Sequence, residues 1–410
     1  MSAAETASPG VLAALRVPSE TRMQSELLAD PELKRLAEDL RRQEGCDSGR
    51  RRLLADGLRV TERVMPALVA AVRECQAVVG MAERPIELYV CSEPHQNASS
   101  IDFGTGQLFL VFTSSLLERM SRPELLFIIG HELGHSGFGH HALPAAALLR
   151  RDGSLAPDKA LALMSWSRRA EISCDRAGLL CSKSLQDATT ALIKLTCGLG
   201  EPLVRFQLDD YLSQMRDIQA LGGSVKDDPD WFSTHPFNPL RVAALYDFSA
   251  SQLYAGLSGG TGAKLGTAEL EARIEGLLKS MEPGRAESRP EVQEALLWGG
   301  YWIASCDGSV DSSEAALLRT LVPEALVQAA AEETARAPQR GALIQGRFAA
   351  AAKRCAALPA ADRHALLQKL IVMARADGKL ADEEIRALHE AAGALGTAPG
   401  FVDQVVKLFD

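Results

Sequence analysis

Apolar residues recur at helical spacing through most of the 410-residue chain, and short alternating runs interrupt this pattern in one place. From about Met23 to Val79 the apolar positions alternate with charged ones at the period of packing helices. PIELYVC, from Pro85, and GQLFLVF, from Gly106, have the apolar and aromatic character of strands, separated by the Gly- and Ser-containing NASSIDFGTG. The pattern predicts a mostly helical α+β fold with one small β-sheet.

Two further helices are indicated after these strands. Ser121 and Glu124 have capping-box spacing, and the apolar stripe within 125–129 continues the helical period. The run SWSRRAEISCDRAGLLCS, from Ser165, predicts a second helix, and helical pattern continues intermittently to about Tyr254.

A Gly-rich stretch within 256–266, SGGTGAKLG, is typical of a linker. Beyond it, WIASCDGSVDSSEAALL, from Trp302, realigns with VMARADGKLADEEIRAL, from Val372, at an offset of 70 residues, which indicates two similar helix-loop-helix units. We therefore predict four regions and expect residues 1 to about 258 to fold without the C-terminal bundle. They are an N-terminal helical region at 1–55, a central domain at 56–258, a linker with a short helix at 259–289, and an all-α bundle with an internal repeat at 290–410.

Charge and cysteine usage narrow the class of protein. The net charge of -9 comes from interspersed acidic and basic residues, which gives no footprint for nucleic acid. The N-terminus lacks the features of a secretory signal, and no apolar run reaches the roughly 18–20 residues of a transmembrane segment. The eight cysteines stand singly, without a CxxC pair, as reduced thiols in a cytosol would. These features predict a cytoplasmic protein.

The segment HELGH contains the chemistry-bearing residues of the central domain. His131 and His135 are one helical turn apart, so their imidazoles project from the same face, and Glu132 borders that face. Two histidines that share one zinc ion, beside a carboxylate that takes a proton from the attacking water, suit peptide-bond hydrolysis. In this interpretation Glu132 is the general base.

Two residues compete as the third zinc ligand. His141 has the metzincin spacing of ten residues from His131, but Phe138 stands where that pattern requires a turn glycine. Glu171 and Asp175, one turn apart in AEISCD, offer one ligand and one carboxylate that orients a ligand histidine. The residues favour Glu171, which leaves His140 and His141 as a solvated helix end or as neighbours of the ligands.

HELGH at 131–135, EISCD at 171–175 and STHPFNPLR at 233–241, in this order, resemble the gluzincin metallopeptidases of the HtpX and CAAX-prenyl-protease family over about residues 60–250. The resemblance implies a zincin-like fold with one zinc ion per chain, held by His131, His135 and Glu171, and Glu132 as the general base. It implies further roles at the same site. These are stabilisation of the developing oxyanion by His235, support of the ligands by Asp175 and Arg241, and substrate binding by Asn97, Ala98 and Phe109. The polar SSID that follows Ala98 departs from the family, which is usually more apolar there.

The paired units CDGSVDSSE and ADGKLADEE resemble the repeats of tellurite-resistance TerB-like domains over about 290–410. Their acidic side chains suit either a divalent cation or the capping of helices, and the spacing, which is not that of an EF-hand, favours capping. The acidic residues are Asp307, Asp311, Glu314, Asp377, Asp382 and Glu384. The resemblance implies a module for regulation, sensing or docking of a protein partner.

Two functions follow from these features. The first is a soluble zinc endopeptidase that acts on a peptide or protein substrate. The second is a catalytically silent, metal-containing scaffold that recruits protein partners, because fold and motif do not by themselves prove turnover. Glu132 and His235 favour the enzyme, since a scaffold needs neither.

Overall fold

The computed structural model describes residues 10–44, 46–149, 155, 157–200, 203, 207–221, 236–261, 263–279, 289–306, 318–319, 321–358, 360–375, 380–397 and 400–403. These residues form two compact units. The first unit contains the described residues within 10–149, 162–217 and 236–278. The second contains those from 279 onward and the short stretches within 155–161 and 218–221.

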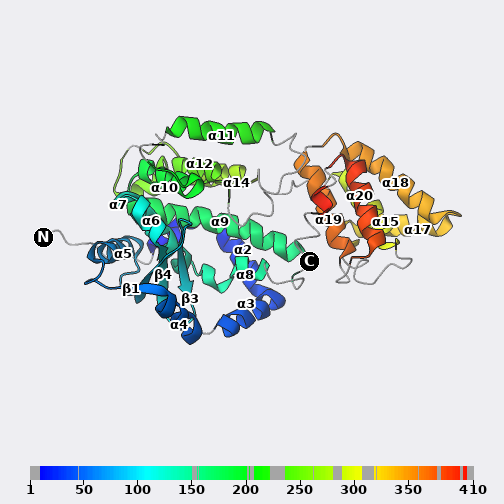
Figure 1. Ribbon diagram of the computed structural model, residues 1–410. Coiled ribbons are helices and arrows are strands. Elements are labelled where there is room, and N and C mark those ends of the chain that lie inside the picture. The colour runs from blue at the N-terminus through cyan, green and yellow to red at the C-terminus, as the bar shows by residue number, and fades with distance from the viewer. Residues whose placement is uncertain are drawn as a thin grey trace. The chain divides into compact units, whose positions relative to one another are not determined.

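The first unit contains a four-stranded sheet with the strand order β1-β2-β4-β3 (Figure 1). The strands are β1 (Gly57–Val60), β2 (Ile86–Cys91), β3 (Ala98–Asp102) and β4 (Leu108–Thr113). β2 and β4 are parallel, with Leu88 opposite Leu110, and the two outer strands pair antiparallel to them. The two predicted strands are thus confirmed as the inner pair of the sheet.

The two outer strands differ from the sequence pattern. β1 lies in a stretch predicted to be helical, and its four residues are too few and too exposed for an alternating signal. β3 occupies the segment that was expected only to separate two strands. Its polar residues Ser99 and Ser100 are half-buried, which an edge strand tolerates because only one of its sides pairs within the sheet.

Helix α7 (Arg122–Gly137) packs against α5 (Pro66–Val79), against α10 (Leu185–Cys197) and beside strand β3. Its start is capped as predicted, because Glu124 Oε2 accepts a hydrogen bond of 2.7 Å from the Ser121 N–H. Phe127, Ile129 and Leu133 are fully buried. The apolar packing of α7 therefore fixes the helix that carries HELGH next to the edge of the sheet.

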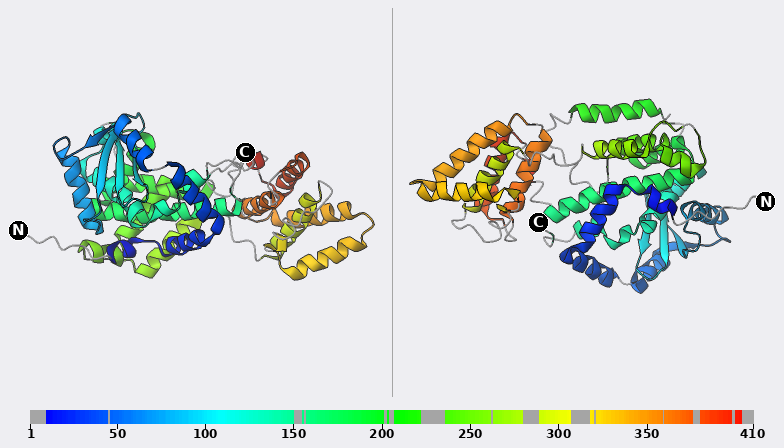
Figure 2. Two further views of the ribbon diagram at one scale, coloured as in Figure 1. Left: turned by 90° about the horizontal axis from the view of Figure 1, so that it is seen from below. Right: turned by 180° about the vertical axis from the view of Figure 1, so that it is seen from behind.

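Helix α9 (Pro157–Ser182) is the second predicted long helix and runs through the middle of the first unit (Figures 1 and 2). The sheet lies on one of its sides, and α10, α12 (Asn238–Ser249) and α14 (Thr267–Leu278) lie on the other. The remaining elements here are α6 (Ser114–Arg119), η1 (His140–Ala142), α8 (Ala145–Leu149), α11 (Leu208–Leu221) and α13 (Gln252–Ser258).

The N-terminal helices are α1 (Gly10–Leu15), α2 (Pro18–Ala29), α3 (Pro31–Glu44) and α4 (Cys46–Asp56). They pack on different parts of the first unit: the α1–α2 segment on α9, α3 on α2 and α8, and α4 on β1. Between α1 and α2, the Val17 N–H donates to Ser173 Oγ at 3.0 Å, and Arg176 donates to the Leu15 carbonyl at 3.3 Å. The N-terminal segment therefore belongs to the same packed unit as the central helices.

Helix α14 (Thr267–Leu278) lies within the segment predicted as a linker at 259–289, yet it is part of the first unit. Leu270, Ile274 and Leu278 are fully buried, and Glu271 pairs with Arg176 of α9 at 2.9 Å. The expectation that residues 1 to about 258 fold alone is accordingly revised, because this packing continues to Leu278.

The second unit consists of helices, as predicted. They are α15 (Pro290–Ala304), α17 (Glu324–Arg336), α18 (Arg340–Cys355), α19 (Ala360–Ala374) and α20 (Asp382–Leu395). α15 and α19 start and end at positions that differ by 70 residues, the offset of the internal repeat, and share a core that includes Leu296, Phe348 and Leu370. Asp307, Asp311, Glu314 and Asp377 lie outside the described residues. The predicted fold class, a mostly helical α+β domain followed by an all-α domain, is confirmed.

None of the helices that the structure describes combines the length and apolar character needed to cross a bilayer.

Candidate metal centre

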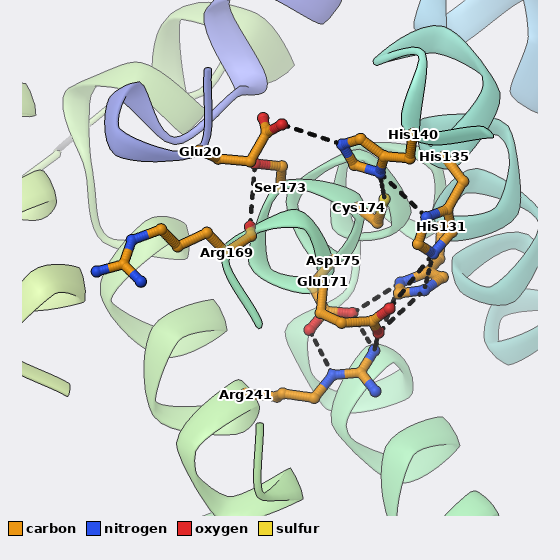
Figure 3. A network of polar contacts seen from close by, with 10 residues as sticks. All are labelled: Glu20, His131, His135, His140, Arg169, Glu171, Ser173, Cys174, Asp175 and Arg241. Atoms are coloured by element: carbon orange, nitrogen blue, oxygen red, sulfur yellow. Dashed lines mark hydrogen bonds and ion pairs between the residues drawn. The ribbon is translucent and has the colours of Figure 1, made fainter. Parts of the chain in front are cut away.

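Helices α7 and α9 bring three ligand side chains together (Figure 3). His131 Nε2 and His135 Nε2 are 3.2 Å apart. Glu171 Oε2 lies 3.5 Å from His131 Nε2, and Glu171 Oε1 lies 3.4 Å from His135 Nε2. Tetrahedral ligands at ~2.0–2.2 Å from zinc are ~3.3–3.6 Å from one another, so the two nitrogens and the carboxylate fit one zinc ion.

Cys174 is a further metal-binding side chain here, since its sulfur and nitrogens of His131 and His135 lie within 4.8 Å of one another. Its Sγ is 3.6 Å from His140 Nδ1, and His140 Nδ1 in turn lies 3.1 Å from His135 Nδ1. Cys174 therefore lies toward the ring nitrogen of His135 that faces away from Glu171. The Glu171 carboxylate, in contrast, lies 3.4–3.5 Å from the Nε2 atoms of both histidines. This geometry favours Glu171 over Cys174 as the third ligand.

His141, the other candidate from the sequence, lines the cavity beside the site. No hydrogen bond or ion pair joins it to His131 or His135 among the described contacts, and its buried Nε2 has no hydrogen-bond partner there. The turn after α7 uses Gly139, with φ of 70°, and follows Phe138. Burial lowers the pKa of His141 to about 4, so the imidazole is neutral at neutral pH.

His131 is held by a carboxylate of α9. Its Nδ1 lies 2.9 Å from Asp175 Oδ1, which leaves Nε2 to face Glu171. Arg241 of α12 donates to both oxygens of Asp175, at 2.8 and 2.5 Å, and lies 3.5 Å from Glu171. Burial alone would raise the pKa of Asp175, but the Arg241 guanidinium and His131 lower it below its usual value. The structure thus places Asp175 and Arg241 beside His131 and Glu171, and their support of the ligands stays a prediction.

His135 is held differently from His131. Its Nδ1 contacts His140 Nδ1, and His140 Nε2 lies 3.3 Å from Glu20 Oε1 of α2. Burial lowers the pKa of His140 to about 4, and this imidazole is neutral at neutral pH. Burial alone would raise the pKa of Glu20, but its contacts with His140 and Arg16 lower it to about 2. His140 is therefore a buried neighbour of the ligands and not a solvated helix end.

A cavity of about 590 Å³ opens beside Glu132, His135 and Glu171. Residues 97–103, which include β3, form part of its wall, so the structure places Asn97 and Ala98 at this cavity. Their role in substrate binding stays a prediction. Phe109 does not line this cavity. It lies on the inner strand β4, is 1% exposed, and packs edge-on against Phe103.

Three other features complete the account of the site. His235, expected to stabilise the oxyanion, lies outside the described residues. Leu40 and Arg41 of α3 line the cavity, and Arg41 donates to the Ala142 carbonyl at 2.8 Å. The sequence did not predict these two residues or Glu20, because they precede the matched motifs and form no motif of their own.

The fold and the site together are those of an HExxH metallopeptidase domain. Residues 63–248 match the model of Peptidase family M48, and residues 293–405 match that of the Tellurite resistance protein TerB. The chain thus carries a peptidase family M48 domain followed by a TerB domain, which confirms both resemblances. Zinc is the metal of this peptidase family, so the predicted cofactor is confirmed as well.

Two similar proteins are named as a metallopeptidase and a metalloendopeptidase. The chain is 29% identical over 185 residues to Plastoglobule-localized metallopeptidase 48, chloroplastic, of Arabidopsis thaliana, covering 42% of this chain and 54% of that protein. It is 27% identical over 199 residues to Metalloendopeptidase OMA1, mitochondrial, of Homo sapiens, covering 42% of this chain and 34% of that protein. The matches thus span about half or less of these relatives. No solved structure matches the chain.

Proposed function

We propose that this chain is a zinc endopeptidase that hydrolyses peptide bonds in a peptide or protein substrate. The observation that carries the proposal is the convergence of His131, His135 and Glu171 within 3.2–3.5 Å of one another, at the wall of the cavity that Glu132 also lines. The names of the similar proteins support the same class of reaction.

The three convergent residues would hold zinc, one ion per chain. When bound there, zinc supplies a Lewis acid that polarises the scissile carbonyl and lowers the pKa of water. Glu132 follows His131 on α7 and lines the cavity, so it takes the proton of the attacking water and then gives a proton to the leaving amine. Asp175 and Arg241 keep His131 and Glu171 in place through the contacts described above.

The substrate is proposed to bind along β3. This strand is at the edge of the sheet and pairs with β4 on one side, so its other side has backbone groups for an extended peptide. Asn97, Ala98 and the rest of the 97–103 segment line the cavity next to Glu132, which would bring a bound peptide within reach of the base.

His235 is proposed to stabilise the oxyanion that develops on the scissile carbonyl. This role rests on its place in STHP, six residues before Arg241, whose guanidinium lies 3.5 Å from Glu171. A donor aimed at the oxyanion typically contributes about 10²- to 10³-fold to turnover.

Zinc content and cleavage of a peptide library, measured on the purified chain, test the proposal. The wild type is expected to hold one zinc per chain and to cleave. Glu132→Gln keeps the side-chain shape but cannot accept a proton, so it should keep zinc and lose about 10²- to 10⁴-fold in turnover. His235→Phe should keep zinc and lose about 10²- to 10³-fold.

Three outcomes would contradict the proposal. A wild-type chain that binds no stoichiometric zinc, even when zinc is added, has no catalytic metal. Undiminished cleavage by Glu132→Gln would remove the general base from the mechanism. A chain that binds zinc but cleaves no member of the library would instead be the scaffold considered from the sequence.

The TerB domain is proposed to regulate the peptidase or to dock a protein partner, as its resemblance to TerB-like domains implies. The cytoplasmic location stays a prediction that rests on the single cysteines. The names of the two relatives place them in a chloroplast and in a mitochondrion, so neither supports it.

A further inference from the structure

The two histidines of HELGH differ in what holds the ring nitrogen that faces away from Glu171. Asp175 contacts His131 directly at 2.9 Å. In the described structure the corresponding contact of His135 is another imidazole, His140, at 3.1 Å. A metal-bound histidine usually donates its second N–H to a carboxylate, a backbone carbonyl or water, and this partner fixes the ring orientation and raises its basicity. For His135 the carboxylate is one contact further away, because Glu20 contacts His140 and His140 contacts His135.

The positions of the hydrogens follow from the ring nitrogens. With Nε2 of His135 directed at the metal, its hydrogen is on Nδ1 and is donated to His140 Nδ1. His140 Nδ1 is then an acceptor, so the hydrogen of the neutral His140 ring is on Nε2, which lies 3.3 Å from Glu20 Oε1. This last contact lacks hydrogen-bond geometry in the structure, and it orients His140 as a charge–dipole contact. The ionised carboxylate thus favours the one tautomer of His140 that can accept from His135.

Glu20 is held rigidly from the other side. Arg16 donates to both of its oxygens, at 2.7 and 2.5 Å, and Trp166 Nε1 donates to Oε1 at 3.3 Å. The Glu20 side chain is fully buried, whereas 19% of the Arg16 side chain is exposed. Burying an ion pair costs several kcal/mol, and an apolar residue of similar size is often as stable. Packing of α2 alone therefore gives no reason for a carboxylate at this place.

We propose that Glu20 is a positioning residue for the zinc ligand His135 and acts through His140. Helix α2 precedes the residues that match the peptidase family, 63–248, so this assigns part of the metal site to a segment outside the family domain. The inference rests on the proposed function, because it takes His135 as a zinc ligand.

The test compares Glu20→Gln with Glu275→Gln in the full chain. Glu275 is the matched control because its carboxylate ties Ser19 of α2 to Arg169 of α9 without contacting either ligand histidine. Zinc affinity is measured by competition with a chelator, the Co(II) absorption spectrum reports the ligand geometry, and unfolding of the metal-free chains reports their stability.

Glu20→Gln is expected to weaken zinc binding about 10- to 100-fold and to shift the Co(II) bands, the usual effect of losing a partner of a ligand. Glu275→Gln should lower stability and leave zinc affinity within about twofold of the wild type, since it touches only the anchoring of α2. Equal zinc affinities for the wild type and Glu20→Gln would overturn the inference. So would an equal loss in both variants, which would mean that α2 acts through packing alone.

His140→Gln tests the same connection if Glu20→Gln does not fold. It should weaken zinc binding to a similar degree. Where Glu20→Gln does fold, the double variant should bind zinc little more weakly than either single variant, because both changes break one chain of contacts. Wild-type affinity in His140→Gln would refute the inference. A wild-type chain without zinc would refute the proposed function instead, whereas zinc binding and cleavage that do not respond to Glu20 would leave the proposed function standing.

Discussion

Acidic side chains are used differently in the two units of this protein. In the first unit, Glu20, Glu171 and Asp175 are buried, and each contacts a histidine or an arginine that comes from another helix. In the second unit, Glu384 is buried as well, but its Oε2 accepts from the backbone N–H of Ala381 at the start of its own helix, at 2.7 Å.

This difference distinguishes carboxylates that form a functional site from carboxylates that cap a helix. A buried carboxylate that contacts another helix needs a partner that is distant in the sequence. Burying such a pair usually gives no more stability than packing apolar residues in its place, so we expect it where the pair has a function beyond packing. A carboxylate at the third position of a helix satisfies a donor that every helix start leaves free. Of the six acidic residues considered from the sequence, the structure describes Asp382 and Glu384, both in the first turn of α20, and the contact of Glu384 with the Ala381 N–H supports capping.

The largest effect is expected at Glu171, the proposed third zinc ligand. Glu171→Ala removes one of three protein donors and leaves Arg241 opposite only one carboxylate. Structural zinc sites are worth about 10–16 kcal/mol, so the loss of about a third of this amounts to roughly 10²- to 10⁴-fold in zinc affinity. Chelator competition measures it directly, and peptide cleavage should disappear with the metal.

Cys174→Ala and His141→Ala serve as its controls. Both remove a side chain near the site without removing an atom of the convergent set, so zinc affinity should change little. Loss of zinc in Cys174→Ala, with retention in Glu171→Ala, would mean that the sulfur is the third ligand. The same result in His141→Ala would restore the metzincin alternative.

Truncation tests where the first unit ends. A chain of residues 1–279 keeps α14, whereas 1–258 loses the Glu271 partner of Arg176, whose side chain is only 1% exposed. Leaving one partner of a buried pair costs on the order of 3–5 kcal/mol, and the apolar contacts of α14 are lost as well. We expect thermal unfolding and zinc content of 1–279 to match those of the first unit in the whole chain, and 1–258 to be poorly folded. Equal stability of both fragments would mean that α14 belongs to the linker and not to the first unit.

A smaller effect is expected for Arg241→Lys. The ammonium keeps the charge but cannot donate to both oxygens of Asp175 as the guanidinium does. Asp175 should then hold His131 less firmly, with zinc affinity about 10-fold lower, the low end of the range for partners of a ligand. Isothermal titration with zinc measures the change. An unchanged zinc affinity would mean that Arg241 only neutralises the charge of the buried carboxylates and does not hold His131 in place through Asp175.

Residues that share one helical turn were the predictable part of the site. His131 with His135, and Glu171 with Asp175, are four residues apart, so their spacing in the sequence already fixes their common face. β4 was predictable for a similar local reason, because its continuous run LFLVF is typical of a strand buried on both faces. β2 was predictable from its β-branched and aromatic residues, although it also contains Glu87.

Contacts between distant segments were not predictable. Glu20 and His140 meet only because α2 packs on α9, and no local pattern in PSETRMQSELLA marks Glu20 as different from any charged residue of a surface helix. β3 was missed because its Ser and Asp residues are typical of loops, and it is a strand because β4 offers it a free edge. α14 was assigned to a linker because glycines precede it, although its apolar face has the period of a packed helix.

The smallest effect is expected for the cap in the second unit. Ala381 has no side-chain acceptor, so the contact of Glu384 with the Ala381 N–H is the only half of a capping box that this helix start can form. Glu384→Ala should lower the free energy of unfolding of the TerB domain by about 1 kcal/mol, the usual cost of a lost cap. Calorimetry of the whole chain should show this as a small shift in one transition, with zinc affinity and peptide cleavage unchanged. Glu384→Gln retains a side-chain oxygen that can accept the same hydrogen bond, so it should restore most of the stability. A strong loss in both variants, accompanied by the loss of a bound divalent cation from the wild-type protein, would instead make the acidic loop a metal site and erase the difference between the two units.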